Sequence, residues 1–264
     1  MEYDLTQLDG EVIGGNFRLD EAIGRGSMGT IYRAEQLSLG KRVVLKILHT
    51  HLMDKALQRE RFEQEARAAS MLAHPNVIQI IDFGRCASGA PYIAMEYIPG
   101  RDLCELLYQD FPIDYIRIIK IATQVCCALD EAHANGVLHR DLKPENIMVS
   151  NRRNMRDFVK VLDFGIAKLL GVNQVKTMAG MVCGTPEYMS PEQARGETLD
   201  GRSDLYALGI LLYQLLTRRL PVTGPTPIAT VTKQLEEAPI KPSQHVPDIP
   251  DDLEALVMAL LEKD

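Results

Sequence analysis

The pattern of apolar residues changes at Pro99-Gly100, and this change restricts the fold more than any other feature of the sequence. Before this point, short β-branched runs alternate with turn residues, as in β-strands. After it, apolar residues recur at helical spacing over long segments. The sequence therefore predicts an α+β fold with a lead-in at residues 1–16, a small β-rich lobe at 17–98 with one main helix, and a larger helical lobe at 99–264.

In the first lobe, the expected elements are short strands and one helix. We predict two strands around a glycine-rich turn within 17–34, further strands at 43–48, 77–81 and 92–97, and a helix over 55–73. The helix is expected because apolar residues recur there at steps of three and four. The break after the last strand is expected to act as a hinge, and clefts between lobes are preferred ligand sites.

The second lobe is expected to be mainly helical. We predict helices at 113–135, at 204–217 and from residue 251, and short strands at 147–149 and 159–162. Residues 204–217 are apolar nearly all round, which predicts a buried central helix. The long loop at 163–192 is expected to be functional, because loops of that length are uncommon in compact domains. Residues 220–250 hold seven prolines and are predicted to be mostly loop.

Composition excludes several classes of protein. The chain carries 29 basic and 36 acidic residues, a net charge of −7, which disfavours nucleic acid as a partner. Its longest apolar run, Leu205–Leu216, is too short for a membrane span. The acidic N-terminus does not resemble a signal peptide, and five cysteines without a CxxC pair suggest free thiols in the cytoplasm. Cys126 and Cys127 are predicted to be buried in the 113–135 helix.

A glycine-rich motif and a lysine indicate phosphate binding in the first lobe. Gly24, Gly26 and Gly29 fit the pattern GxGxxG, but the segment that follows is strand-like, which argues against a dinucleotide fingerprint. Glycines in a hairpin let backbone N–H groups approach phosphate oxygens. Lys46 is either a surface lysine whose charged end reaches solvent or a cation for phosphates, in which case Glu65 on the predicted helix is its expected partner.

The octet His139–Asn146 is the most informative motif. Asp141 can orient a hydroxyl and take its proton, Lys143 can neutralise charge on a moving phosphoryl group, and the amide oxygen of Asn146 can bind Mg²⁺. A polar loop without a chemical role remains the alternative. Asp163-Phe164-Gly165 follows a predicted strand, but this pattern alone is common in turns.

The segments GRGSMGTIY, VVLK, HRDLKPEN, DFG and GTPEYMSPE occur in the order found in protein kinases. From Phe17 to its last residue, the chain resembles the protein kinase superfamily, and most closely the eukaryotic-like serine/threonine kinases of bacteria. The resemblance implies a bilobal protein kinase fold. It also implies transfer of the ATP γ-phosphate to Ser or Thr hydroxyls of protein substrates, with Mg²⁺ as cofactor and Mn²⁺ as an alternative.

The resemblance also carries roles over to individual positions. Asp141 would be the catalytic base, Lys143 would contact the γ-phosphate, and Asn146 and Asp163 would hold the metal ion. Lys46 would hold the α and β phosphates and pair with Glu65. Asp204, in the predicted central helix, would brace the catalytic loop. The residues implied to bind ATP are Ile23, Gly24, Gly26, Gly29, Ile31, Val44, Lys46, Met95, Glu96, Ile98, Asp102 and Asp163.

The resemblance further implies regulation by phosphorylation of the 163–192 loop. Arg140, beside the catalytic aspartate, would form a cationic cluster with Lys168 that pairs with a phosphate on Thr177. Thr185 would contact the catalytic loop as part of the substrate platform. Autophosphorylation in trans would require self-association of two chains.

Three expectations complete the prediction. One alternative function is an ATP-binding pseudokinase scaffold, and the complete set of Lys46, Asp141, Asn146 and Asp163 argues against it. Another is a small-molecule phosphotransferase of the kinase fold, and the segment GTPEYMSPE, which resembles the platform for protein substrates, argues against that. The chain is expected to stop before the last helix of the domain, so that Glu192 lacks the arginine that pairs with it in the family. A full-length protein could continue into a membrane anchor outside this chain.

Overall fold

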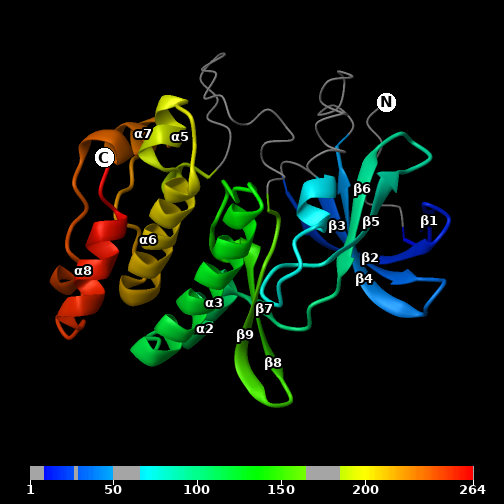
Figure 1. Ribbon diagram of the computed structural model, residues 1–264, viewed down its shortest axis with the longest axis horizontal. Helices are drawn as coiled ribbons and strands as arrows, with labels where there is room; N and C mark the ends of the chain where they lie inside the picture. Colours follow the sequence, from blue (N-terminus) through cyan, green and yellow to red (C-terminus); the bar gives the residue numbers. More distant parts are fainter. Residues whose placement is uncertain (1–8, 27–28, 50–65, 165–184, 264) are drawn as a thin grey trace. The chain divides into compact units, whose positions relative to one another are not determined.

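The computed structural model describes residues 9–26, 29–49, 66–164 and 185–263 (Figure 1). The chain divides into two compact units. Unit 1 contains residues 1–73 and 78–99, and unit 2 contains residues 74–77 and 100–264. None of the helices within the described ranges is both long enough and apolar enough to cross a membrane.

Unit 1 is built on a six-stranded sheet in the order β1-β2-β3-β4-β6-β5, and every neighbouring pair is antiparallel. Its strands are β1 (Val12–Ile13), β2 (Phe17–Arg25), β3 (Gly29–Gln36), β4 (Lys41–Leu48), β5 (Ile80–Arg85) and β6 (Pro91–Glu96). Phe17, Tyr32 and Leu45 are fully buried and lie in one apolar cluster with Tyr92. Burial of these large side chains is the main stabilising contribution to the unit.

Two expectations for unit 1 need correction. β1 lies within the predicted lead-in, and its Ile13 is buried in the core of the sheet. The strand predicted at 77–81 is wrong in its position, because β5 begins at Ile80, whereas Val77 belongs to unit 2 and pairs there with Val161. The Val77 carbonyl accepts a hydrogen bond of 2.8 Å from Lys160 Nζ, a polar anchor that apolar periodicity cannot reveal. Of the helix predicted at 55–73, residues 66–73 are described. Residues 66–70 are helical, but 71–73 are not, so the helix ends three residues earlier than predicted.

Unit 2 combines a small antiparallel sheet with helices (Figure 1). The sheet has the order β7-β8-β9, with β7 (Arg101–Asp102), β8 (Ile147–Arg152) and β9 (Met155–Val161). The α-helices are α2 (Leu103–Asp110), α3 (Tyr115–Ala134), α5 (Pro191–Arg195), α6 (Gly201–Thr217), α7 (Pro227–Glu236) and α8 (Asp251–Leu260). Short 3-10 helices occur at η3 (Pro144–Asn146), η4 (Pro186–Tyr188) and η5 (Pro242–Gln244).

The α6 helix lies in the core of unit 2, as its continuous apolar sequence predicts. It packs against α3 and α8. At Gly209 the neighbouring helix comes so close that an added Cβ would lie 2.8 Å from Leu260 Cβ. Asp200 caps the N-terminus of α6 by accepting a hydrogen bond from the Arg202 amide.

Two helices and one burial pattern differ from the prediction. The α2 helix was not expected, and α7 lies in the segment predicted to be mostly loop. Pro227 is compatible with a helix because it occupies the first turn, where its missing N–H is not needed. Cys126 and Cys127 are exposed, since Val125, Ala128 and Leu129 already form the buried face of α3.

Candidate active site

The glycine-rich segment of unit 1 forms the end of the β2–β3 hairpin. Gly24 pairs with Ile31, and the Gly26 N–H donates a hydrogen bond of 2.9 Å to the Gly29 carbonyl. At Gly29 the backbone of β4 is so close that a Cβ would lie 2.2 Å from the Ile47 carbonyl oxygen, so only glycine fits. An added Cβ at Gly26 would meet nothing closer than 3.9 Å. The packing of the hairpin therefore does not require a glycine at position 26.

Lys46 lies in the middle of the sheet, between Ile31 of β3 and Ile93 of β6. Only 8% of the residue is exposed, which excludes a freely solvated surface lysine. Glu65, its predicted partner, lies outside the described residues. Val44 lies two residues before Lys46 on β4 and pairs with Met95 of β6.

Other residues implied to bind ATP lie near the strand ends. Ile23 on β2 is 49% exposed. The Glu96 carboxylate accepts a hydrogen bond of 2.9 Å from the Gln79 amide, and Ile98 is half-buried after β6. In unit 2, Asp102 caps α2 by accepting a hydrogen bond of 2.7 Å from the Glu105 amide. The cap holds one carboxylate oxygen of Asp102 and leaves the second as an acceptor for another group.

The catalytic-loop motif of unit 2 brings four of the predicted side chains together. Lys143 Nζ lies 3.0 Å from Asp141 Oδ2 and donates a hydrogen bond of 2.9 Å to Thr185 Oγ1. Asn146 Nδ2 donates to the Asp141 carbonyl at 2.7 Å and lies 3.3 Å from its carboxylate. A carboxylate, an ammonium group, an amide and a hydroxyl therefore lie in one partly exposed cluster. Such a cluster can orient a hydroxyl and neutralise a phosphoryl group.

A buried carboxylate holds the backbone of this loop. Asp204 is 1% exposed and accepts hydrogen bonds from the backbone N–H groups of His139 at 2.9 Å and Arg140 at 2.8 Å. His133 Nε2 lies 2.7 Å from the same carboxylate. Arg140 has φ 67°, a left-handed conformation that costs a non-glycine residue about 1–2 kcal/mol. The two backbone hydrogen bonds help to stabilise this conformation next to Asp141.

The environment of Asp204 keeps it ionised. Burial alone raises the pKa of a carboxyl group, because it disfavours the charged form. The hydrogen bond with His133, the nearby His139 and the two backbone amides outweigh burial and lower the pKa of Asp204 below its usual value. The carboxylate is therefore a charged acceptor, which makes its hydrogen bonds stronger than neutral ones.

The residues after β9 are linked to the same loop. The Leu162 N–H donates to the Asn146 carbonyl at 2.8 Å, and the His139 ring nitrogen Nε2 lies 2.8 Å from the Leu162 carbonyl. The next residue, Asp163, has φ 59°, and Phe164 packs edge-on against His139 with ring centroids 4.8 Å apart. These contacts fix the backbone on both sides of Asp163 relative to the catalytic loop. Non-glycine residues at positive φ are uncommon and cluster at active sites.

The segment with Thr185 is held from three helices. Gln193 on α5 donates to the Arg140 carbonyl at 2.8 Å and forms a capping box with Ser190. Tyr188 donates to Gln214 on α6, and Gln234 on α7 donates to the Glu187 carbonyl at 2.8 Å. This segment is thereby fixed next to Lys143.

Glu192 accepts a hydrogen bond from Ser203 Oγ on α6. The carboxylate therefore has a partner within the chain, which sequence analysis did not foresee.

The donor chemistry of this cluster fits a magnesium ion. Asn146 uses its amide nitrogen for Asp141, so its amide oxygen is the atom with which it would bind a cation. An amide oxygen and the Asp163 carboxylate are the hard ligands that Mg²⁺ prefers. The described residues include no group of three or more His, Cys, Asp or Glu side chains arranged for a metal ion. A few protein ligands together with phosphate oxygens are typical of Mg²⁺ at phosphoryl-transfer sites.

Several predicted residues lie outside the described part of the chain, namely Glu65, Lys168 and Thr177. Sequence reasoning missed His133 and Gln193 as supports of the catalytic loop. The spacing of Ser190 and Gln193 is a readable capping-box signal. His133 offers no local signal, because its partner is 71 positions away in the sequence.

Comparison with known proteins identifies the class of domain to which these two units belong. Residues 17–264 match the protein kinase domain family, so the chain belongs to that family. The chain is 50% identical over 265 residues to the serine/threonine-protein kinase pkn3 of Myxococcus xanthus, covering 98% of this chain and 48% of pkn3. It is 38% identical to PknB of Mycobacterium leprae, covering 94% of this chain and 40% of PknB. The chain thus spans about half or less of these relatives.

Solved structures agree with this classification. The kinase domain of Mycobacterium tuberculosis PknI superposes with a TM-score of 0.75 at 27% identity, covering 97% of this chain and 91% of that domain. Rad53 in complex with AMP-PNP gives a TM-score of 0.77 at 26% identity, covering 94% of this chain and 61% of that structure. The predicted α+β protein kinase fold is therefore confirmed, as is the predicted relationship to bacterial serine/threonine kinases.

Proposed function

We propose that this chain is the catalytic domain of a serine/threonine protein kinase that transfers the γ-phosphate of ATP to Ser or Thr hydroxyls of protein substrates. The observation that carries the proposal is the cluster of Asp141, Lys143, Asn146 and Thr185. Its relatives are named serine/threonine-protein kinases. A pseudokinase scaffold is disfavoured, because scaffolds usually lack at least one of the residues that correspond to Lys46, Asp141, Asn146 and Asp163, and this chain has all four.

Asp141 is the proposed base for the substrate hydroxyl. Its carboxylate is 24% exposed, so it is accessible to a hydroxyl group, and Lys143 at 3.0 Å and Asn146 at 3.3 Å hold it in place. A base must lie within hydrogen-bonding reach of the proton it accepts. The Asn146 amide fixes the orientation of the Asp141 carboxylate, so less entropy is lost when this group reaches the geometry for reaction.

Lys143 and Thr185 are proposed to position the transferred group and the substrate. The Lys143 ammonium is shared by Asp141 and Thr185, and it supplies the positive charge that a phosphoryl group requires during transfer. Because Thr185 belongs to the segment fixed by α5, α6 and α7, its hydroxyl gives the lysine a stationary partner.

Each unit by itself carries residues that we propose bind part of the nucleotide. In unit 1 we propose that the backbone N–H groups of the Gly24–Gly29 hairpin bind phosphate oxygens and that Lys46 contacts the α and β phosphates. In unit 2 we propose that Asn146 and Asp163 hold the metal ion. When bound, Mg²⁺ would neutralise phosphate charge, and Mn²⁺ has the same ligand preference. The remaining ATP-binding residues stay predictions.

Regulation by phosphorylation of Thr177 also stays a prediction, with Arg140 and Lys168 as the proposed cationic partners. Autophosphorylation in trans, self-association and a cytoplasmic location are part of the same prediction.

Mass spectrometry of the chain after incubation with ATP and Mg²⁺ tests the proposed function. We expect phosphate to appear on Ser or Thr residues of the wild-type chain, on Thr177 in particular, and to be absent from Asp141→Asn. Asp130→Asn is the matched control, because Asp130 lies exposed on α3 and the charge change is the same. Equal phosphorylation of wild type and Asp141→Asn would refute the assignment of the base. Lack of phosphate in the wild type, with ATP binding shown by a thermal shift, would favour a scaffold.

A further inference from the structure

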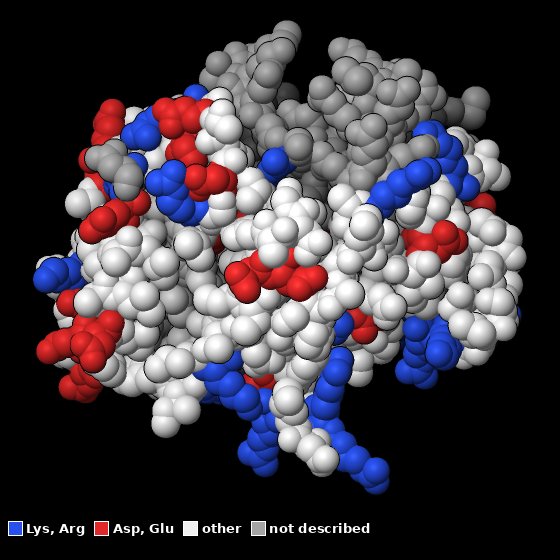
Figure 2. All heavy atoms as spheres, viewed as in Figure 1, with Lys and Arg blue, Asp and Glu red and all other residues white. Residues whose placement is uncertain are grey.

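The turn that joins β8 to β9 carries an unusual concentration of positive charge. Arg152, Arg153 and Arg156 all lie in or beside this turn, and residues 150–156 contain no acid. All three arginines are exposed. Figure 2 shows Lys and Arg side chains projecting at this end of unit 2. The chain as a whole has a net charge of −7, so this basic tip is opposite in sign to the average surface.

Ion pairing does not neutralise the basic tip within the described part of the chain. None of the ion pairs between described residues involves Arg152, Arg153 or Arg156. Arg152 lies over the Phe158 ring with its guanidinium carbon 3.5 Å from the centroid, which keeps the planar group flat on the hairpin. The tip therefore presents guanidinium groups to any anion that approaches it.

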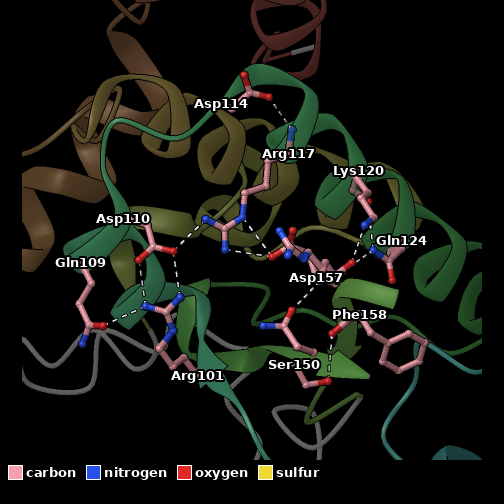
Figure 3. Close-up of polar contacts among 12 residues, drawn as sticks. Arg101, Gln109, Asp110, Asp114, Arg117, Lys120, Gln124, Ser150, Asp157 and Phe158 are labelled. Atoms are coloured by element: carbon pink, nitrogen blue, oxygen red, sulfur yellow. Dashed lines mark hydrogen bonds and ion pairs between the residues drawn. The ribbon is translucent and has the colours of Figure 1, made fainter. Parts of the chain in front are cut away.

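The nearby carboxylates are already occupied by other arginines (Figure 3). Asp157 accepts from Arg117 Nε and Nη2 at 3.0 and 2.9 Å. Asp110 accepts from both Arg117 and Arg101. Hydrogen bonds from Arg101 and then Arg117 lower the pKa of Asp110 to about 2, so it stays charged and paired at neutral pH. Neither carboxylate is left to neutralise the tip.

The backbone under the tip is braced against α3. Asp157 adopts φ 55° at an irregularity in the β8–β9 register, and its N–H donates to Asn151 Oδ1 at 3.2 Å. Lys120 Nζ donates to the Arg156 carbonyl, and Gln124 Nε2 donates to the Asp157 carbonyl at 2.8 Å. Figure 3 shows the Lys120 and Gln124 side chains pointing toward the backbone beside Asp157. A fixed backbone reduces the entropy lost when its side chains bind a ligand.

We propose that Arg152, Arg153 and Arg156 form a docking site for a phosphorylated segment of a partner protein, one that carries phosphoserine or phosphothreonine. Guanidinium groups bind phosphate bidentately, and a doubly charged phosphate can engage more than one of them. The inference rests on the proposed function, since phosphorylated segments are what such a domain produces. A site of this kind would retain a partner after its first phosphorylation.

The observations favour a peptide over other anions. Nucleic acid presents negative charge over an extended surface, and a chain with a net charge of −7 would repel it outside the hairpin. Lipid-binding basic segments usually carry about four to eight Lys or Arg residues, more than the three arginines of this tip. A single phosphate on a peptide matches the small size of the site.

Fluorescence anisotropy with a labelled phosphothreonine peptide tests the proposal, and Arg153→Gln/Arg156→Gln is the informative variant. Neither of these two side chains takes part in an ion pair with another described residue, and Arg152 is left on Phe158 to preserve the hairpin. Lys41→Gln/Arg42→Gln is the matched control, because it removes two charges from an exposed strand end in unit 1. We expect affinity to fall about tenfold in the hairpin variant, as for loss of charge-assisted contacts, and less than about twofold in the control.

Three results would overturn the proposal. The first is an equal loss of affinity in the hairpin variant and the control, which would indicate net charge alone. The second is equal affinity for the phosphothreonine peptide and its glutamate analogue. The third is binding to phosphatidylglycerol vesicles without binding to the peptide, which would assign the tip to a membrane. Transfer of phosphate to a short unphosphorylated peptide is measured in parallel. If the wild-type chain transfers no phosphate but still binds the phosphothreonine peptide, the proposed function is refuted and the docking site is not.

Discussion

The substitution Asp204→Asn should weaken both the fold of unit 2 and phosphate transfer. Asparagine keeps the size of the side chain but exchanges one acceptor oxygen for a donor nitrogen. Asp204 uses both oxygens, Oδ1 for the Arg140 amide and Oδ2 for the His139 amide and His133. One buried backbone N–H must therefore lose its acceptor in the variant.

The magnitude follows from counting these contacts. A buried donor left without an acceptor costs about 1–3 kcal/mol, and the contacts that remain lose their charge assistance. We expect the free energy of unfolding to fall by about 3 kcal/mol. If about 2 kcal/mol of this loss also appears in the transition state, kcat falls about thirtyfold, since 1.4 kcal/mol corresponds to a factor of ten. The affected step is the positioning of Asp141, because Arg140 at φ 67° precedes it.

The pH dependence has a definite sign. The pKa of Asp204 is lowered in the folded chain relative to its ordinary value of 3.8. Its contribution is therefore fully present above the unfolded pKa and is lost as the pH falls through the folded pKa. The stability difference between wild type and Asp204→Asn should be largest near neutral pH and should shrink below pH 3.8.

Urea unfolding and initial-rate kinetics measure the two effects. Asp200→Asn is the matched control, because Asp200 lies at the exposed N-terminus of the same helix and accepts from Arg202. We expect the control to lose less than about 1 kcal/mol, as for an exposed cap and ion pair. If Asp204→Asn matched the control in both unfolding midpoint and kcat, the bracing of the loop by this carboxylate would be refuted.

Three further predictions concern other parts of the chain. Gly29→Ala should lower the thermal midpoint of unfolding, because its Cβ would lie 2.2 Å from a carbonyl oxygen of β4. Gly26→Ala should leave the midpoint unchanged and weaken ATP binding alone. Equal midpoints for the two variants would contradict the argument. Arg117→Gln should destabilise the chain by about 1–2 kcal/mol at pH 7 in urea unfolding. This difference should shrink as the pH falls from 3.8 toward 2, where Asp110 becomes protonated, so a constant difference would refute the pairing. Gln234→Leu should cost about 2–4 kcal/mol in the same assay, because a tyrosine hydroxyl and a backbone carbonyl lose a fully buried partner, and a loss below about 0.5 kcal/mol would contradict this.

Local sequence patterns predicted the elements whose apolar surface decides their structure. The α6 helix is apolar nearly all round and is buried, and β4 is a β-branched run in the centre of a sheet. The same reasoning misplaced the strand at 77–81, because Val77 is held by the Lys160 side chain and by pairing with Val161. It also missed α7, whose proline is compatible with a helix only because it stands in the first turn. Whether a proline is compatible with a helix depends on its distance from the helix end, and apolar periodicity does not give that distance.

In the candidate site, the sequence predicts which side chains come together but not the backbone conformation that orients them. The motif HRDLKPEN contains Asp141, Lys143 and Asn146, and the structure brings these three side chains together. Their orientation depends on the positive φ of Arg140 and on hydrogen bonds that the loop backbone donates to Asp204 of α6, which no residue type in the motif specifies.

A single substitution in α6 can therefore alter a loop whose own sequence is unchanged. Asp204 lies 65 and 64 positions after His139 and Arg140, the two loop residues that it binds, and it accepts hydrogen bonds only from their backbone N–H groups. Backbone groups are the same at every position, so no side-chain motif within the loop can reveal this contact. The hydroxyl-bearing segment around Thr185 depends in the same way on the Gln193 side chain, which binds the Arg140 carbonyl. Both the N–H and the carbonyl group of Arg140 are thus bound by side chains outside the loop. This explains why the geometry of Asp141 depends on helices that contribute no side chain to the predicted chemistry.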